Sequence, residues 1–354
     1  MLTSPRTSRV ASLTMSSISK KSNNLNIYWF RHQDLRLHDN PALQKCIDDS
    51  KKQSNSEGIV PIFCFDPRFV GRTTTTPFGS LKCSVKRAKF ILESVQDLRM
   101  NLEQNGSGLV VAYGHTEDVM EKICHSMSSI GEDSNELGIQ PNLFCQEEIA
   151  SEEIAVDKAV KRVLKKYKGS FTSTWGSALY DIDDLPDVFN GGVHGIPDTF
   201  TPFRTKMEKK CKIGNPIDKP SKTNLSLPIN EEIQAVLNGE GKQSIPNCSL
   251  SYMPSLQDLG YSNDEIDFAT KHDERGVMNF KGGETAALAR VQDYIFDKDR
   301  LKIYFDTRNG MLGADYSTKF SPWLAHGCLS PRFVAKECKR YEEETGIVNK
   351  STYW

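Results

Sequence analysis

Short apolar runs alternate with amphipathic segments along the first half of the chain, and this alternation constrains the fold more than any other feature. The runs are rich in β-branched and aromatic residues, as strands are. They occupy residues 26–30, 59–65, 109–112, 143–145 and 171–174. Strands separated by helices pair in parallel, because each crossover needs a connection of helix length. The pattern therefore predicts a doubly wound, parallel, five-stranded α/β sheet with ligands at the carboxyl ends of its strands.

Helix signals fill the gaps between these runs. Asn40 as N-cap and Pro41 at the first position predict one helix, and Thr116 is expected to cap another. Residues 154–164 predict a further helix. The longest predicted helix has an apolar stripe at three- and four-residue spacings, formed by Val85, Ala88, Leu92, Val95, Leu98 and Leu102. No G-x-G-x-x-G motif follows a strand, which disfavours an ordinary dinucleotide-binding fold.

The alternation stops near residue 180, which indicates a division of the chain. Much of the proline and glycine falls in the next stretch, as in an inter-domain connection that wraps the first domain. After Met278 the signals are helical, with Leu288, Val291 and Ile295 on one face. We expect an α/β domain over residues 25–180, a connector over 181–261 and an all-α domain over 262–354.

The first 24 residues differ from the rest. No acidic residue precedes Asp34, whereas serine, threonine, lysine and arginine are frequent. This composition is typical of an organellar transit peptide and equally of a disordered tail. The first interpretation directs the protein to a chloroplast or mitochondrion, and the second leaves it in the cytoplasm or nucleus.

Cysteine usage and hydropathy exclude several classes. The nine cysteines are scattered and form no C-x-x-C pair, so the sequence predicts neither a zinc site nor a redox disulfide. We expect buried, reduced thiols of an intracellular protein. No apolar run approaches the roughly 20 residues of a membrane-spanning helix. A net charge of −1 gives no argument about nucleic acid.

The segment ADYSTKFSPWL over residues 314–324 carries the clearest chemistry. Ser321 and Pro322 predict the N-cap and first position of a helix, whose free amides would face the preceding loop. Hydroxyls of Ser317 and Thr318 and the cation of Lys319 would complete a donor set suited to a diphosphate. Taken alone, the pattern favours a plain helix cap without a ligand, because capping serines far outnumber phosphate sites, and we keep that interpretation for the Ser-Pro pair at 330–331.

The longest motif resembles the flavin-phosphate region of the cryptochrome and photolyase family, cryptochrome-DASH branch. It reads TRNGMLGADYSTKFSPWLA over 307–325 and GCLSPR over 327–332. Further matches are WFR at 29–31, DLRLHDNPAL at 34–43, KRAKF at 86–90, ESVQDLR at 93–99 and WGSALY at 175–180. One departure is His32-Gln33, where the family usually has a single residue. The extra residue is expected to bulge the first strand-to-helix turn and to alter the geometry of Arg31 and Asp34.

The resemblance implies an FAD site in the helical domain. Its residues would be Tyr304, Ser317, Thr318, Lys319, Phe320, Ser321 and Trp354. From spacing alone, Tyr304 is better interpreted as a core aromatic residue. Relatives continue past the position of Trp354, so we expect this chain to be C-terminally incomplete and to hold FAD weakly or not at all.

A second cofactor is expected in the first domain. Glu147 and Glu148 follow the fourth strand, where a carboxylate could accept hydrogen bonds from the amino group of a pterin ring. The family commonly has a folate antenna in this area, which implies 5,10-methenyltetrahydrofolate. For Glu152 and Glu153 an acidic helix start is at least as good an explanation.

The function implied by the resemblance is blue-light absorption and repair of cyclobutane pyrimidine dimers, preferentially in single-stranded DNA, by electron transfer from reduced FAD. In full-length relatives this is a carbon–carbon lyase activity that needs no catalytic acid, base or nucleophile. We expect this chain alone to be inactive. The alternatives are a photoreceptor that signals through protein partners and a truncated antenna or binding module. We expect a monomer with no membrane contact, and RNA is a further candidate partner. A solvated surface charge is the favoured interpretation for each of the basic residues nearest to a DNA-binding role, which are Arg275, Lys281, Arg290, Lys319 and Arg332.

Overall fold

A twisted sheet forms the centre of the first domain in the computed structural model, which describes residues 23–130, 138–189, 192–241, 243–271, 276–310 and 313–347. The order of its strands is β5-β4-β1-β2-β3-β6. Their bounds are β1 Asn24–Phe30, β2 Ser56–Phe65, β3 Val110–Tyr113, β4 Gln140–Gln146, β5 Ser170–Thr174 and β6 Cys248–Ser249. The first five pair in parallel, as the sequence predicts. Because β1 lies between β2 and β4, the chain changes direction across the sheet at the β1–β4 pair.

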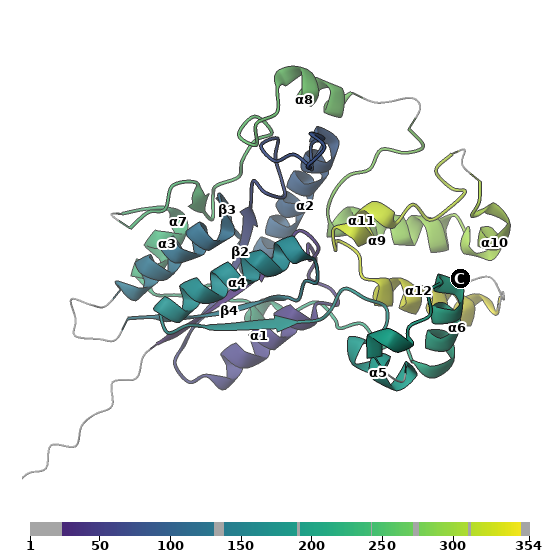
Figure 1. The fold of residues 1–354 in the computed structure, drawn as a ribbon, viewed down its shortest axis with the longest axis horizontal. Helices are drawn as coiled ribbons and strands as arrows, with labels where there is room; N and C mark the ends of the chain where they lie inside the picture. Colours follow the sequence, from purple (N-terminus) through teal and green to yellow (C-terminus); the bar gives the residue numbers. More distant parts are fainter. Residues whose placement is uncertain are drawn as a thin grey trace, which may run out of the picture.

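Helices cover both faces of this sheet (Figure 1). On β1, Tyr28 and Phe30 share a core with α1, Pro41–Lys52, and α2, Val85–Gln104. The alternate residues Ile27 and Trp29 point to the other face. There they pack against α3 Thr116–Ser128, α4 Ser151–Lys166 and α7 Glu231–Asn238. The doubly wound α/β architecture is therefore confirmed.

The sheet has a sixth strand that the sequence pattern did not predict. β6 is only two residues long, lies inside the expected connector and pairs antiparallel with β3. Helix α7 comes from the same stretch and buries Ile233, Val236 and Leu237 against the sheet. Two residues cannot show an alternating pattern, so tertiary pairing alone defines this strand.

The predicted cap at Thr116 was wrong. His115 occupies the N-cap position of α3 and makes no side-chain capping bond. Thr116 is the first helical residue, and its amide and Oγ1 donate to Oδ2 of Asp66 at 3.0 and 2.9 Å. The carboxylate at the end of β2 therefore supplies the cap that we had assigned to the threonine.

The last part of the chain is helical, and the described residues between 276 and 347 include no strand. Its elements are α9 Glu284–Gln292, a π-helical turn Asp293–Asp297, α10 Tyr304–Thr307, α11 Ser321–Ala325 and α12 Pro331–Thr345. Before it, the connector contributes α5 Leu185–Val188, α6 Phe200–Lys210 and α8 Asn263–Thr270. One hydrophobic core joins the two parts, because Val291, Tyr294 and Trp323 belong to the same cluster as Phe63 and Phe90.

The cysteine side chains lie mainly inside the protein, as the sequence predicts. None of the nine, all within the described residues, forms a disulfide, and each is buried apart from the half-buried Cys211. None of the helices in the described ranges is long and apolar enough to cross a membrane.

Candidate functional site

Arg290 holds the predicted flavin-phosphate loop in place. Its side chain is 6% exposed and projects from α9. One guanidinium donates to the carbonyl oxygens of Ala314 and Thr318, at 2.7 and 3.2 Å, and lies 3.2 Å from Oδ1 of Asp315. Three contacts to one loop from a buried, planar cation fix the backbone between residues 314 and 318.

This loop presents unused donors. The hydroxyls of Ser317, Thr318 and Ser321 make no hydrogen bond to any other residue that the structure describes. Lys319 has φ +60°, a left-handed conformation that costs a non-glycine residue of the order of 1–3 kcal/mol and clusters at binding sites. Phe320 is buried, with its ring centroid 6.2 Å from that of Tyr294. Hydroxyls and an ammonium group are the donors that a diphosphate accepts, so the residues present fit the phosphates of FAD.

The predicted N-cap at Ser321 was wrong. Phe320 takes the N-cap position of α11, Ser321 is the first helical residue, and no side-chain cap bond forms. The prediction at residues 330–331 was right: Ser330 caps α12, and its Oγ accepts from the amides of Arg332 and Phe333 at 3.1 and 3.3 Å. The two Ser-Pro pairs therefore differ in local structure although their sequences match.

Tyr304 begins α10 and is half-buried against the main core. The helical part also has exposed apolar side chains, with Phe305 55%, Tyr316 46% and Leu324 40% exposed. A planar cofactor would cover such groups. Trp354, the remaining predicted FAD contact, lies outside the described residues.

Glu148 lies at the topological switch point of the sheet, two residues after β4 and beside the turn that follows β1. Its side chain is 6% exposed, and Oε1 is 3.7 Å from Nε of Arg31 with no hydrogen-bond partner. Burial raises its pKa to about 7, although Arg31 acts in the opposite direction. Glu147 is exposed, and its amide donates to the carbonyl of Thr174 at 3.0 Å. A buried carboxyl with an unused oxygen can accept a hydrogen bond from a pterin amino group, so of the two predicted residues only Glu148 faces inward.

Arg31 is buried beside Glu148. Its Nη1 lies 2.5 Å from Oδ1 of Asp157, and its guanidinium lies over the Trp29 ring, 4.4 Å from the centroid. The turn expected at His32-Gln33 is present, and the amide of Asp34 donates to the carbonyl of Arg31 at 3.0 Å. The extra residue is thus accommodated in a hydrogen-bonded turn.

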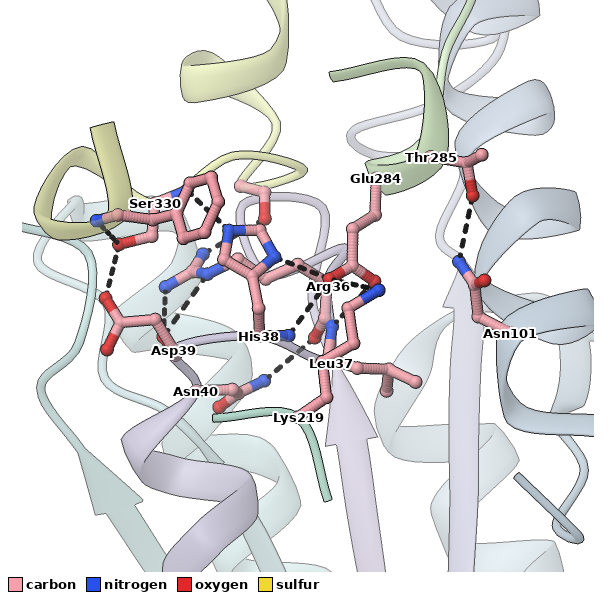
Figure 2. Close-up of polar contacts among 12 residues, drawn as sticks. Arg36, Leu37, His38, Asp39, Asn40, Asn101, Lys219, Glu284, Thr285 and Ser330 are labelled. Atoms are coloured by element: carbon pink, nitrogen blue, oxygen red, sulfur yellow. Dashed lines mark hydrogen bonds and ion pairs between the residues drawn. The ribbon is translucent and has the colours of Figure 1, made fainter. Parts of the chain in front are cut away.

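A polar cluster between the two parts escaped the sequence analysis. Figure 2 shows Glu284, at the start of α9, above the loop that joins β1 to α1. Its carboxylate is fully buried and accepts from the amides of Leu37 and His38 at 3.1 and 3.0 Å and from Nδ1 of His38 at 2.5 Å. Nothing in the local sequence separates this glutamate from a surface residue, because its partners lie 246 and 247 positions away.

Two of the basic residues considered for DNA have structural roles instead. Arg332 donates from Nε and Nη2 to the carboxylate of Asp39, at 2.9 and 2.7 Å, and this pair joins α12 to the first domain. Arg290 is buried under the loop described above, so neither is a solvated charge. Lys281 is exposed, Lys319 is half-buried, and Arg275 lies outside the described residues.

Comparisons with known proteins agree with this architecture. The profile of the DNA photolyase family matches residues 26–223, more than half of the chain. The chain belongs to the DNA photolyase family. Among curated members, "Cryptochrome DASH, chloroplastic/mitochondrial" of Ostreococcus tauri is 39% identical over 340 residues, covering 93% of this chain and 57% of that protein. The protein of the same name from Arabidopsis thaliana is 37% identical over 349 residues, covering 98% of this chain and 52% of the relative.

Solved structures of the family have the same fold. A Synechocystis cryptochrome superposes with a TM-score of 0.72 at 34% identity, covering 95% of this chain and 59% of that one. A class III photolyase of Agrobacterium tumefaciens gives 0.61 at 23% identity, a likeness of fold alone. This photolyase-family chain thus spans about half the length of the relatives that it matches.

Proposed function

We propose that this photolyase-family protein is a blue-light-absorbing FAD flavoprotein of the cryptochrome-DASH type that repairs cyclobutane pyrimidine dimers in single-stranded DNA. The observation that carries the proposal is the loop of residues 314–321, held by Arg290 with three hydroxyls left unused. FAD, when bound and reduced, would supply under light the electron that splits the dimer ring. A lesion in a single strand has no partner base to displace, which lowers the cost of bringing it to the cofactor.

The chain's own residues would bind and orient the cofactor. Ser317, Thr318 and Ser321 would donate hydrogen bonds to its phosphates, and the ammonium group of Lys319 would balance their charge. Tyr304 and Phe320, together with Trp354, would provide apolar contact and exclude water. None of these residues transfers a proton.

Glu148 would hold the second cofactor, 5,10-methenyltetrahydrofolate. Its unpaired Oε1 would accept a hydrogen bond from the pterin amino group, and Arg31, which is itself paired with Asp157, would hold the carboxylate in place. The FAD loop packs in the core on one face of the sheet, and the segments next to Glu148 pack in the core on the other face. Because one sheet joins both cores, the separation of the two cofactors would be constant, as energy transfer requires. We further propose an organellar destination, with residues 1–24 as the transit peptide, by analogy with the relatives named chloroplastic/mitochondrial.

FAD binding tests the first part of the proposal. Titration of the purified chain with FAD, followed by quenching of flavin fluorescence, should give weak but saturable binding. Lys319→Ala should weaken it about tenfold, because a charge-assisted hydrogen bond contributes about 1.5–3 kcal/mol. Lys281→Ala removes an exposed lysine from the same part of the chain and should leave the affinity unchanged. Equal effects of both changes would contradict the assigned site.

Repair tests the second part. Illumination of the complete, FAD-loaded protein with an oligonucleotide that contains one thymine dimer should convert the dimer to thymines, measured by chromatography, and a dark sample should not change. If FAD is bound and the dimer survives illumination, the result contradicts repair and favours a photoreceptor that signals through protein partners.

A further inference from the structure

A basic groove lies between α12 and the segment that follows α6, two elements that lie side by side in Figure 1. Its volume is about 390 Å³, within the usual range of ligand sites. None of the residues assigned to FAD or to the folate lines it. The groove therefore needs an explanation separate from the proposed cofactor sites.

The charges in the groove are unbalanced. Lys212 and Lys336 are exposed and form no ion pair with any residue that the structure describes. Lys339 is 3.8 Å from Glu343, and the two side chains are 70% and 67% exposed. Such exposed ion pairs contribute little to stability. The acidic member of the lining, Glu208, already pairs with Arg204 at 3.1 Å. Three lysines thus remain for an anion.

The opposite wall offers backbone donors. The amides of Lys212, Ile213, Gly214 and Asn215 have no hydrogen-bond partner among the described residues. A methyl group placed on Gly214 would meet no atom within 4 Å, so this backbone is open to a ligand. Unpaired amides beside ammonium groups form the donor set that phosphate oxygens accept.

Tyr180 adds an aromatic surface. Its ring lines the groove and packs at its back against the small cluster of Val188, Phe189 and Met207. Because packing already fixes this ring in the folded protein, stacking on a nucleobase would cost little further conformational entropy. Cations, amides and a fixed aromatic ring together match a nucleoside phosphate better than a simple anion.

We propose that this groove is a nucleoside-phosphate site that takes a short stretch of single-stranded nucleic acid. Lys336 and Lys339 lie on one face of α12, and Lys212 lies on the opposite wall of the groove. Three lysines on two walls can contact more than one phosphate, which favours a strand over a mononucleotide. The site needs neither light nor FAD, so it does not depend on the proposed repair function.

Binding of undamaged oligothymidylate in the dark, without FAD, tests the proposal. Fluorescence anisotropy of a labelled decanucleotide is measured against salt concentration. The double variant Lys212→Ala, Lys336→Ala should bind at least tenfold more weakly at low salt, and the slope of log affinity against log salt should fall by about 1.4, because each lost phosphate contact contributes about 0.7. The charge-conserving Lys212→Arg, Lys336→Arg variant should keep both values.

A matched control separates this site from general charge. Lys209→Ala, Lys210→Ala removes two exposed lysines at the end of α6 that do not line the groove, and binding should stay unchanged. Thymidine monophosphate, used as a competitor, distinguishes the ligands. Tighter binding of the decanucleotide identifies a strand, whereas equal affinities identify a free nucleotide in the same site. Equal losses in the two double variants, or no binding of either ligand, would overturn the proposal.

Discussion

Several ionisable side chains of this photolyase-family protein are buried, and one of them, Glu148, belongs to a proposed cofactor site. In the folded protein its carboxyl is out of water and its pKa is raised to about 7. A group with a raised pKa favours the protonated folded state. Its contribution to stability is complete below the pKa of the unfolded chain, near 4.5, and is lost as pH rises through about 7.

Glu148→Gln should therefore flatten the decline in stability between pH 5 and pH 8. The wild type should lose up to about 3 kcal/mol from this group, and the variant should not, because glutamine does not ionise. Asp34, also buried with its pKa raised to about 7, should leave a residual slope. Urea unfolding at a series of pH values measures the effect. Glu147→Gln, at the exposed neighbour, should reproduce the wild-type curve, and any flattening there would contradict the assignment.

Glu284 shows the opposite shift. Burial alone would raise its pKa, but the hydrogen bond from His38 and the charge of Lys219 outweigh burial and lower the pKa to about 2. The stability from this group is complete above the unfolded pKa of about 4.5 and is lost as pH falls towards 2. Glu284→Gln should cost about 3 kcal/mol at pH 7, since it leaves buried donors unpaired. Denaturant titration of Glu121→Gln, which breaks an exposed pair with Lys166, should show a loss below about 1 kcal/mol.

For single residues, the sequence predicted which side chains could bind a ligand better than it predicted which residues contact one another. The donors of the loop at 314–321 were found because hydroxyls and a lysine are adjacent in sequence. Arg290, which positions the loop, was found only as a basic residue, because its partners are 24 to 28 positions away. Between the two neighbouring glutamates, only the fold decides that Glu148 is buried and Glu147 exposed.

At the scale of elements, the two Ser-Pro pairs are the clearest lesson. Helix α12 has a true serine cap because Ser330 has extended backbone angles, φ −85° and ψ 134°. Before α11 the left-handed Lys319 turns the chain first, and Phe320 takes the cap position in a helical conformation. The sequence shows that a serine precedes a proline, but it does not show the backbone angles at that serine. The cap was therefore predicted correctly at Ser330 and wrongly at Ser321.

Replacing each serine by alanine tests this difference. Ser330→Ala should destabilise the protein by about 2 kcal/mol, because it removes the cap and a donor to buried Asp39. Ser321→Ala should cost less than about 0.5 kcal/mol in the absence of FAD, since its hydroxyl caps nothing. Thermal unfolding of both variants measures the two values, and similar losses would refute the observed caps.

At the scale of the whole molecule, the two parts meet at a backbone contact. Gly327, with φ +62°, lies against the turn after β1, and a Cβ atom there would be 1.9 Å from the carbonyl oxygen of Gln33. The five parallel strands and the helical second part could be predicted from periodicity. This contact could not, because it depends on how the two parts pack and on a turn with an additional residue.

Gly327→Ala should separate the parts or force the turn to move, at a cost of about 3 kcal/mol or more. Gly346→Ala is the matched control: its φ is +68°, but its Cβ would meet nothing within 4 Å, so only about 1–2 kcal/mol of backbone strain is expected. Hydrogen exchange should show faster exchange in residues 35–40 and α12 for Gly327→Ala alone. Equal exchange in both variants would argue against the contact.

The long span of these contacts has a consequence for biosynthesis. Arg36 is buried, and one of its donors pairs with the carbonyl of Gly327, 291 positions further along. A ribosome adds about 5–20 residues per second, so this guanidinium waits on the order of 15–60 s for its partner to emerge. After β5 has been made, the parallel sheet carries the loop of Arg36 without its partners Glu284 and Gly327, beside apolar surface that the helical part later covers. The nascent α/β domain is therefore a natural client for chaperones until the helical part has been made.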